Sequence, residues 1–365
     1  MNIRRRIKNI FNQDGNDADL ILIKNGSDPF IDTNFFYTTG IDKGFFEGCA
    51  ALLYPSGNVE LIVSELEAGL AEKTGLDVII YKKRQEFTDI LKNSFKKYKQ
   101  IGVNYDGISY KSYQFLKEHF FRKEFVDISE NLTYARMIKE DEELKKIKKA
   151  CKISDKVAEK IPSVCKKGMK EYELAAEIDY LLEKNGADCP AFLTISSFGK
   201  NSALPHYSHG DSKLKNGDII LCDFGASFKK YNSDITRVFI VGKATKKQKK
   251  MYETVKEAQK IGINSVSEKI QGKEVHKKVN DFIDNSEFRG LFIHSTGHSL
   301  GMDVHDGGVG FNSECEMDLT ENMVLTVEPG IYDRSLGGIR IEDDIVVKNN
   351  KARVISKACK EFIEL

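Results

Sequence analysis

The chain has 365 residues, 41% of them hydrophobic, which is enough to build two domains with apolar cores. Its 56 Lys and Arg residues nearly cancel 55 Asp and Glu residues, so no general field favours nucleic acid or an anionic membrane. We therefore expect a small, locally recognised ligand. The seven cysteines include no Cys-x-x-Cys pair, which predicts reduced thiols in a cytoplasm, and we expect neither a signal peptide nor a membrane-spanning segment.

Residues 1–135 predict an α/β domain, because short β-rich runs alternate with stretches of helical period. The expected strands are residues 20–23, 49–54, 59–63, 78–81, 101–104 and 125–128, and the expected helices include residues 87–98 and 110–120. Little concentrated chemistry lies in this half of the chain. We expect it to have a supporting role.

Residues 136–365 predict a second domain that repeats one pattern. A long charged helix opens it over residues 139–161, and a second helix and two β-runs, 219–224 and 235–241, follow. The order helix, helix, strand, strand then recurs and ends in β-runs 323–327 and 339–347. Equivalent points in the two sets lie roughly 105 residues apart, which predicts two related halves.

Four carboxylates accompany the β-runs of this second domain. Asp223 lies in the apolar run Ile-Ile-Leu-Cys-Asp-Phe, and Asp234 begins the next strand, so antiparallel pairing is expected to bring them face to face. Glu328 ends a strand before Pro-Gly. Glu342 stands at a position of the last strand whose side chain is expected to face the core. Carboxylates buried in apolar strands require a compensating cation.

Three of the seven histidines fall within residues 294–306, where Gly297 would let the backbone approach whatever the His298 ring binds. The alternative is a solvated loop, and each acid alone could equally be a strand-edge charge or a partner of Arg237 or Arg340. Jointly, four carboxylates and one imidazole are too hard a ligand set for structural zinc and too negative for one divalent ion. The pattern predicts two cations, Mn²⁺ or Co²⁺, with Fe²⁺ or Zn²⁺ as alternatives, and hydrolysis of an amide or ester.

These residues resemble the motifs of the metal-dependent aminopeptidases with the pita-bread fold, metallopeptidase family M24. The resemblance rests on Asp223-Phe-Gly, Thr296-Gly-His298, Val304-His305-Asp306, Glu328-Pro-Gly and Arg340-Ile-Glu342. It implies a creatinase-like N-terminal α/β domain followed by a pseudo-twofold α+β catalytic domain. It also implies that two metal ions are held by Asp223, Asp234, His298, Glu328 and Glu342.

The Arg-x-Glu-Asp sequence around Glu342 resembles the proline-specific branch, which contains Xaa-Pro aminopeptidases and Xaa-Pro dipeptidases, rather than methionine aminopeptidases. The implied reaction is hydrolysis of the bond between an N-terminal residue and a following proline in a small peptide. A methionine-type or unspecific aminopeptidase and a non-catalytic peptidase-fold binding protein remain alternatives. The resemblance further implies a homodimer.

Catalytic and substrate-binding roles follow from the same resemblance. Glu328 is expected to accept and pass on a proton, and Arg340 to balance the acidic cluster. His206 and His305 are expected to hydrogen-bond the reacting oxygens or the departing end of the substrate. Together with His294 and Tyr332 they are expected to line the substrate pocket.

Overall fold

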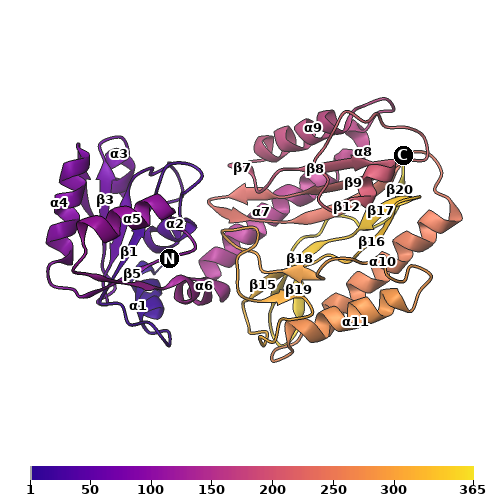
Figure 1. Ribbon diagram of the computed structural model, residues 1–365. Coiled ribbons are helices and arrows are strands. Elements are labelled where there is room, and N and C mark those ends of the chain that lie inside the picture. Colours follow the sequence, from indigo (N-terminus) through magenta and orange to yellow (C-terminus); the bar gives the residue numbers. More distant parts are fainter. Residues whose placement is uncertain (1) are drawn as a thin grey trace. The chain divides into compact units, whose positions relative to one another are not determined.

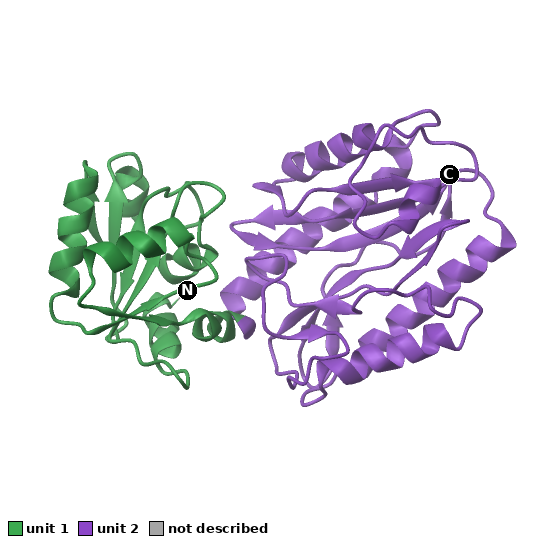
Figure 2. Cartoon of the chain, in the orientation of Figure 1, with its two compact units in different colours: residues 1–136 green, residues 137–365 purple. Residues whose placement is uncertain are grey.

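The computed structural model describes residues 2–365 and divides into two compact units (Figures 1 and 2). Unit 1 ends at Arg136, and unit 2 runs from Met137 to Leu365. No helix within residues 2–365 combines the length and the apolar character needed to cross a bilayer.

Unit 1 is built on a six-stranded sheet with the order β4-β3-β2-β1-β5-β6. The strands are β1 (Leu20–Lys24), β2 (Ala50–Leu53), β3 (Val59–Ser64), β4 (Asp77–Tyr81), β5 (Gln100–Val103) and β6 (Glu124–Asp127). β2 runs antiparallel to both of its neighbours, and the other five strands are parallel to one another. All six predicted strands are confirmed, and in every strand except β4, whose Ile80 is exposed, apolar residues are buried by the sheet.

Six helices belong to this part of the chain, and the two predicted ones are confirmed as α4 and α5. They are α1 (Ile3–Phe11), α2 (Thr33–Thr39), α3 (Ala68–Ala71), α4 (Arg84–Phe95), α5 (Tyr110–His119) and α6 (Ser129–Met137). Leu91 and Phe95 of α4 and Leu116 of α5 are fully buried in one cluster with Leu22 and Leu52 of the sheet. The sheet and these two helices therefore share a core.

Unit 2 contains the predicted repeat. Its first half has α7 (Asp141–Ala158), α8 (Ile161–Val164), α9 (Glu171–Lys184), β7 (Cys189–Pro190), β8 (Ile195–Phe198), β9 (Ile219–Phe224), β10 (Ala226–Phe228), β11 (Tyr231–Asn232) and β12 (Ile235–Ile240). The predicted helix 139–161 is shorter than expected, because α7 ends before the α8 turn that contains Pro162. β9 and β12 pair antiparallel in the sheet β20-β12-β9-β8.

The second half repeats two helices and an antiparallel strand pair. It has α10 (Lys246–Ser265), α11 (Gly272–Asp284), β13 (Gly297–His298), β14 (Gly310–Phe311), β15 (Val324–Val327), β16 (Gly330–Asp333), β17 (Gly337–Arg340), β18 (Asp343–Val347), β19 (Ala352–Val354) and β20 (Ile363–Glu364). β15 pairs with β18 as β9 pairs with β12. α10 and α11 lie along one side of the strands of unit 2, and α8 and α9 lie along the other (Figure 1).

Strand β9 is buried on both faces, and this burial positions the first acidic residue. Ile220 and Cys222 pack into the core beneath α7 and α9, whereas Ile219 and Leu221 pack into the core shared with α10 and β17. Asp223 has the parity of Ile219 and Leu221, so its carboxylate lies on the face directed at the second half.

Candidate metal centre

The two acids of the first half lie on one face of the β9–β12 pair. The register places Asp223 opposite Thr236, so the predicted face-to-face pairing of Asp223 with Asp234 is wrong. Asp234 lies just before β12 and two residues from Thr236, which makes it a diagonal neighbour of Asp223 on the same face. The two carboxylates still share one site.

The two acids of the second half lie at the ends of strands. Glu328 directly follows β15. Glu342 lies in the two-residue link between β17 and β18, so its predicted place within a continuous strand is wrong. The backbone N–H of Glu342 donates to the carbonyl oxygen of Thr236 at 3.3 Å, which ties this link to β12 of the first half.

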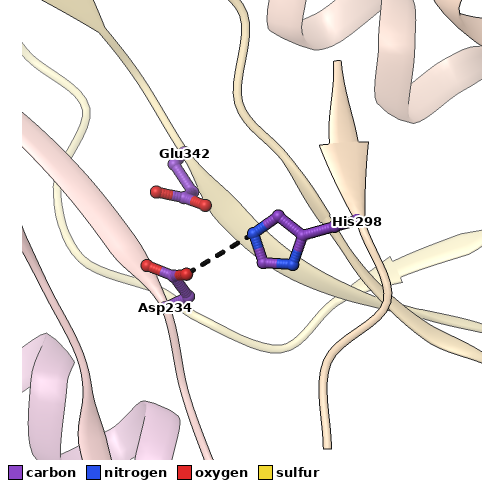
Figure 3. Close-up of side chains that lie close together, drawn as sticks. All are labelled: Asp234, His298 and Glu342. Atoms are coloured by element: carbon purple, nitrogen blue, oxygen red, sulfur yellow. Dashed lines mark ion pairs between the residues drawn. The ribbon is translucent and has the colours of Figure 1, made fainter. Parts of the chain in front are cut away.

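The imidazole of His298 lies near acids of both halves. One possible ligand atom each from Asp234, His298 and Glu342 lies within 4.8 Å of the others, and Figure 3 shows the ring edge directed at the two carboxylates. The Nε2 atom of His298 is 3.6 Å from Oδ2 of Asp234 and 3.4 Å from Oε1 of Glu328. These residues come from segments far apart in the sequence.

The protonation of His298 suits a ligand. Its Nδ1 lies 3.0 Å from the carbonyl oxygen of Ser299, and because a carbonyl can only accept, this contact assigns the ring hydrogen to Nδ1. Burial lowers the pKa of His298, which keeps the ring neutral. The Nε2 lone pair therefore points toward the carboxylates, in the tautomer that binds metal ions.

Gly297 has a different role from the one predicted. A Cβ atom at this position would lie 2.0 Å from the carbonyl oxygen of Thr326. The glycine therefore lets β13 approach β15, whereas the sequence suggested an approach of the backbone to a bound ligand. The N–H of His298 donates to Oγ1 of Thr326 at 3.1 Å across the same contact.

Asp223, Asp234 and Glu342 are buried and Glu328 is partly buried, and their negative charges repel one another. Burial and then neighbouring carboxylates raise the pKa of Asp234 and of Glu342 well above the usual range, and burial raises the pKa of Glu328 to about 7. The Oδ1 atoms of Asp223 and Asp234 are buried without a hydrogen-bond partner. Clustered carboxylates with unused buried oxygens are chemically suited to divalent cations.

Arginine neutralises only part of this charge. NH2 of Arg340 donates to Oδ2 of Asp223 at 2.5 Å. Asp223 therefore has an arginine partner, which was the alternative interpretation of each acid. The other candidate, Arg237, pairs instead with Asp343 at 2.7 Å. Among residues 2–365, no Lys or Arg lies within ion-pair distance of the remaining acids, Asp234, Glu328 and Glu342.

A directed chain of hydrogen bonds continues from Arg340. Its NH1 donates to the Tyr332 hydroxyl at 2.7 Å, and that hydroxyl lies 2.7 Å from Nε2 of His294. Nδ1 of His294 contacts the carbonyl oxygen of Ser295 at 2.8 Å and so carries the hydrogen, which leaves Nε2 to accept from Tyr332. Burial and then the charge of Arg340 lower the pKa of His294 to about 3, so its ring is neutral.

The other two predicted histidines lie at the edge of the cluster. The ring centroid of His305 is 4.1 Å from that of His298, and its side chain is exposed. His206 is exposed in the turn that follows Ala203 and makes no hydrogen bond or ion pair with any described residue. Burial lowers the pKa of both His294 and His305, and the charge of His206 lowers both slightly further, which indicates that His206 lies near the same region.

Three supporting residues were not predicted. Oγ1 of Thr236 donates to Oε2 of Glu342 at 2.7 Å, and Oγ1 of Thr326 donates to Oε1 of Glu328 at 3.2 Å. Asp344 accepts a hydrogen bond from the N–H of Asp234 at 3.1 Å. The two threonines stand two residues from Asp234 and Glu328 respectively, so strand parity was the signal that could have identified them.

The fold and the site together define a two-domain protein whose second domain contains a cluster of carboxylates around an imidazole. Residues 145–349 match metallopeptidase family M24, and residues 4–138 match the creatinase/prolidase N-terminal domain. The chain belongs to metallopeptidase family M24. The predicted family, the predicted fold and the prediction of a metal-dependent peptidase are therefore confirmed.

Similar proteins span nearly the whole chain. An Xaa-Pro dipeptidase of Pyrococcus furiosus is 36% identical over 344 residues, which cover 92% of this chain and 97% of that protein. The structure of an Xaa-Pro dipeptidase from Bacillus anthracis matches with a TM-score of 0.90 and 32% identity, covering 100% of this chain and 99% of that one. An X-Pro aminopeptidase structure from Thermotoga maritima matches with a TM-score of 0.89 and 29% identity, covering 99% of both chains.

Proposed function

We propose that this protein hydrolyses the peptide bond between an N-terminal residue and a following proline, using two divalent metal ions. The observation that carries the proposal is the group of three acids without a Lys or Arg partner around the neutral imidazole of His298, of which Asp234 and Glu342 are buried and Glu328 is partly buried. The similar proteins named as Xaa-Pro dipeptidases and as an X-Pro aminopeptidase support the choice of substrate.

The donor set fits a pair of cations. The proposed ligands are Asp223, Asp234, His298, Glu328 and Glu342. Arg340 occupies only Oδ2 of Asp223, so Oδ1 remains to bind a cation. Hard oxygen donors with one imidazole favour Mn²⁺ or Co²⁺, with Fe²⁺ or Zn²⁺ as alternatives. When bound, such ions polarise a carbonyl and lower the pKa of a bound water.

The ligand Glu328 and the side chains around the proposed ligands have roles in proton transfer, charge balance and substrate binding. Glu328 accepts and releases the proton that passes from the attacking water to the leaving amine. Arg340 balances the acidic cluster and, through Tyr332, orients His294. His206 and His305 hydrogen-bond the reacting oxygens or the departing end of the substrate, and His294 and Tyr332 line the substrate pocket.

Proline changes what a peptidase can recognise. An Xaa-Pro bond has no N–H to donate, and the ring fixes the direction of the chain, so a site that reads extended backbone handles it poorly. A centre that holds the carbonyl and the free amine of the first residue does not need that N–H.

The free state of all seven cysteines accords with a cytoplasmic location. We propose a homodimer from the family resemblance.

The test compares substrates on protein that has been stripped of metal and then reloaded with Mn²⁺ or Co²⁺. The panel is an Xaa-Pro dipeptide, an Xaa-Pro-Yaa tripeptide, the matching Xaa-Ala peptides and a Met-Ala peptide. We expect hydrolysis of at least one proline substrate and much slower hydrolysis of its alanine counterpart. Preference for Met-Ala would favour a methionine-type aminopeptidase, and hydrolysis of none by folded, metal-loaded protein would favour a binding protein.

A matched pair of variants tests the assigned ligands. Asp223→Asn removes a proposed ligand charge, and we expect it to lose bound metal and hydrolysis together. Asp211→Asn makes the same change at an exposed position outside the cluster and is expected to keep both. Full activity of Asp223→Asn would exclude the role proposed for this residue.

A further inference from the structure

A second candidate site lies in unit 1, at the edge of the sheet where its parallel strands end. β1 ends at Lys24, β4 ends at Tyr81 just before α4, and the loop after β5 leads to α5. Because these strands are parallel, their carboxyl ends meet at one edge, together with the amino ends of the helices that follow. Open α/β sheets bind ligands at this edge.

A cavity of about 890 Å³ occupies this edge. Its lining combines three cationic side chains, Lys24, Arg84 and Lys111, with serine hydroxyls and aromatic rings. The volume is in the range of small-molecule pockets, about 300–1,000 Å³. The metal centre of unit 2 contributes none of these residues.

Lys24 is the unusual member of the lining. It is partly buried, its ammonium donates to Oγ of Ser112 at 3.3 Å and to the carbonyl oxygen of Asn25 at 3.2 Å, and no carboxylate among residues 2–365 pairs with it. Burial and then the neighbouring charge of Arg84 lower the pKa of Lys24 to about 8. A partly buried ammonium without a counter-charge loses part of its solvation, and a bound anion would compensate for that loss.

The other cations of the cavity are also unpaired. Neither Arg84 nor Lys111 forms an ion pair with any described residue, and the guanidinium of Arg84 lies 5.3 Å from the ring centroid of Phe115. Asp28 is the only acid in the lining, so the cations outnumber it. Unpaired lysines and arginines are common on surfaces, but here they converge on one cavity with Lys24.

The remaining lining indicates the chemistry of the anion. The N–H groups of Tyr110 and Lys111 at the start of α5 and the hydroxyl of Ser112 can donate to an anion with several oxygens. The Ser109 hydroxyl is already used, because it accepts from the Ser112 N–H at 3.2 Å and donates to Oγ of Ser112 at 3.1 Å. Lys24, Arg84 and a helix amino end favour a doubly charged phosphate over a carboxylate. The rings of Phe30 and Tyr110 are 52% and 75% exposed and offer flat apolar surfaces to a planar group.

We propose that this cavity of unit 1 binds a small phosphate ester that carries a planar ring, such as a nucleoside phosphate or an aryl phosphate. The phosphate contacts Lys24, Arg84 and the amino end of α5, and the ring stacks on the exposed aromatic side chains. The site is separate from the peptidase centre, so it is a ligand site in addition to the proposed function.

The test is calorimetric titration of the full-length protein with six compounds: adenosine 5′-phosphate, guanosine 5′-diphosphate, phenyl phosphate, inorganic phosphate, adenosine and benzoate. We expect the ring-bearing phosphates to bind more tightly than inorganic phosphate, and adenosine and benzoate not to bind in the same range. Nucleoside phosphates that bind better than phenyl phosphate would identify the nucleoside class, and the reverse order would identify aryl phosphates.

Variants locate the site. Lys24→Met keeps most of the apolar stem and removes the charge, and we expect it to weaken binding about ten-fold or more. Arg84→Met is expected to act in the same direction. Lys117→Met makes the same change at an exposed position of α5 outside the cavity and should bind as the unmodified protein does. If Lys24→Met fails to fold, Arg84→Met and Ser112→Ala give the answer.

Any of four results would overturn the inference. The first is no binding of any phosphate at millimolar concentration. The second is binding that Lys24→Met and Arg84→Met leave unchanged, and the third is benzoate that binds as tightly as the ring-bearing phosphates. Asp234→Asn tests whether the phosphate binds instead to the metals of unit 2. We expect this variant to lose peptidase activity and to retain phosphate binding. Loss of phosphate binding in Asp234→Asn would also contradict a site in unit 1.

Discussion

Replacing Thr236 by valine isolates one buried contact that supports a proposed metal ligand. Valine has nearly the same shape, but it lacks the hydroxyl that donates to Oε2 of Glu342 at 2.7 Å and accepts from Nε of Arg340 at 3.0 Å. All three side chains are buried. Each buried polar group left without a partner costs about 1–3 kcal/mol, so Thr236→Val should lower the free energy of unfolding by about 2–6 kcal/mol.

The same substitution should weaken metal binding. Loss of a hydrogen bond that orients a ligand typically lowers metal affinity by about 10–100-fold. Urea unfolding of the stripped protein and titration with Mn²⁺ measure the two effects separately. Thr236→Ser keeps the hydroxyl and should recover most of both. Equal metal affinity in Thr236→Val and the unmodified protein, or equal damage in the serine and valine variants, would refute the assigned role.

Three further substitutions test other contacts by urea unfolding. Gly297→Ala would place a Cβ atom 2.0 Å from the carbonyl oxygen of Thr326, so we expect the free energy of unfolding to fall by roughly 1–3 kcal/mol. Unchanged stability would contradict the close packing of β13 on β15. Lys139→Met removes one partner of the buried ion pair with Asp306 (3.0 Å) and should cost about 3–5 kcal/mol; a loss below about 1 kcal/mol would argue against that pair. The third concerns pH: the pKa of His294 is about 3 when folded against 6.5 as the ordinary value, so the unfolded chain binds more protons between these values. The free energy of unfolding should fall as pH drops from 6.5 toward 3, by up to about 1.4 kcal/mol per pH unit. The fall should be less steep in His294→Phe. Parallel pH profiles of the variant and the unmodified protein would contradict this.

Much of the fold could be predicted because burial follows local pattern. The strands of unit 1 were located from their runs of apolar and β-branched residues, which the sheet buries in all of them except β4. The recurrence of helix, helix, strand, strand in unit 2 was visible because both halves bury similar amphipathic faces. α1 and α2 were not predicted, since both are short and α2 is buried along nearly its whole length, which leaves no amphipathic period.

The grouping of the site residues was easier to predict than their geometry. The chain between β9 and β12 forms an extra hairpin, β10–β11, with Lys229 and Lys230 at positive φ, and this hairpin sets the register that offsets Asp234 from Asp223. No Gly or Pro marks the break before Glu342, so β17 and β18 read as one strand. Tertiary packing decided both features, and a single sequence does not show it.

The central claim is that the acids of both halves and His298 hold metal ions that the reaction requires. Elemental analysis of the stripped and Mn²⁺-reloaded protein, performed beside Xaa-Pro hydrolysis, tests this claim most directly, with Asp234→Asn and the control Asp211→Asn treated in parallel. We predict that two ions per chain return together with hydrolysis in the unmodified protein and the control, and that Asp234→Asn regains neither. Full hydrolysis by protein shown to be free of metal, or full metal content in Asp234→Asn, would contradict it.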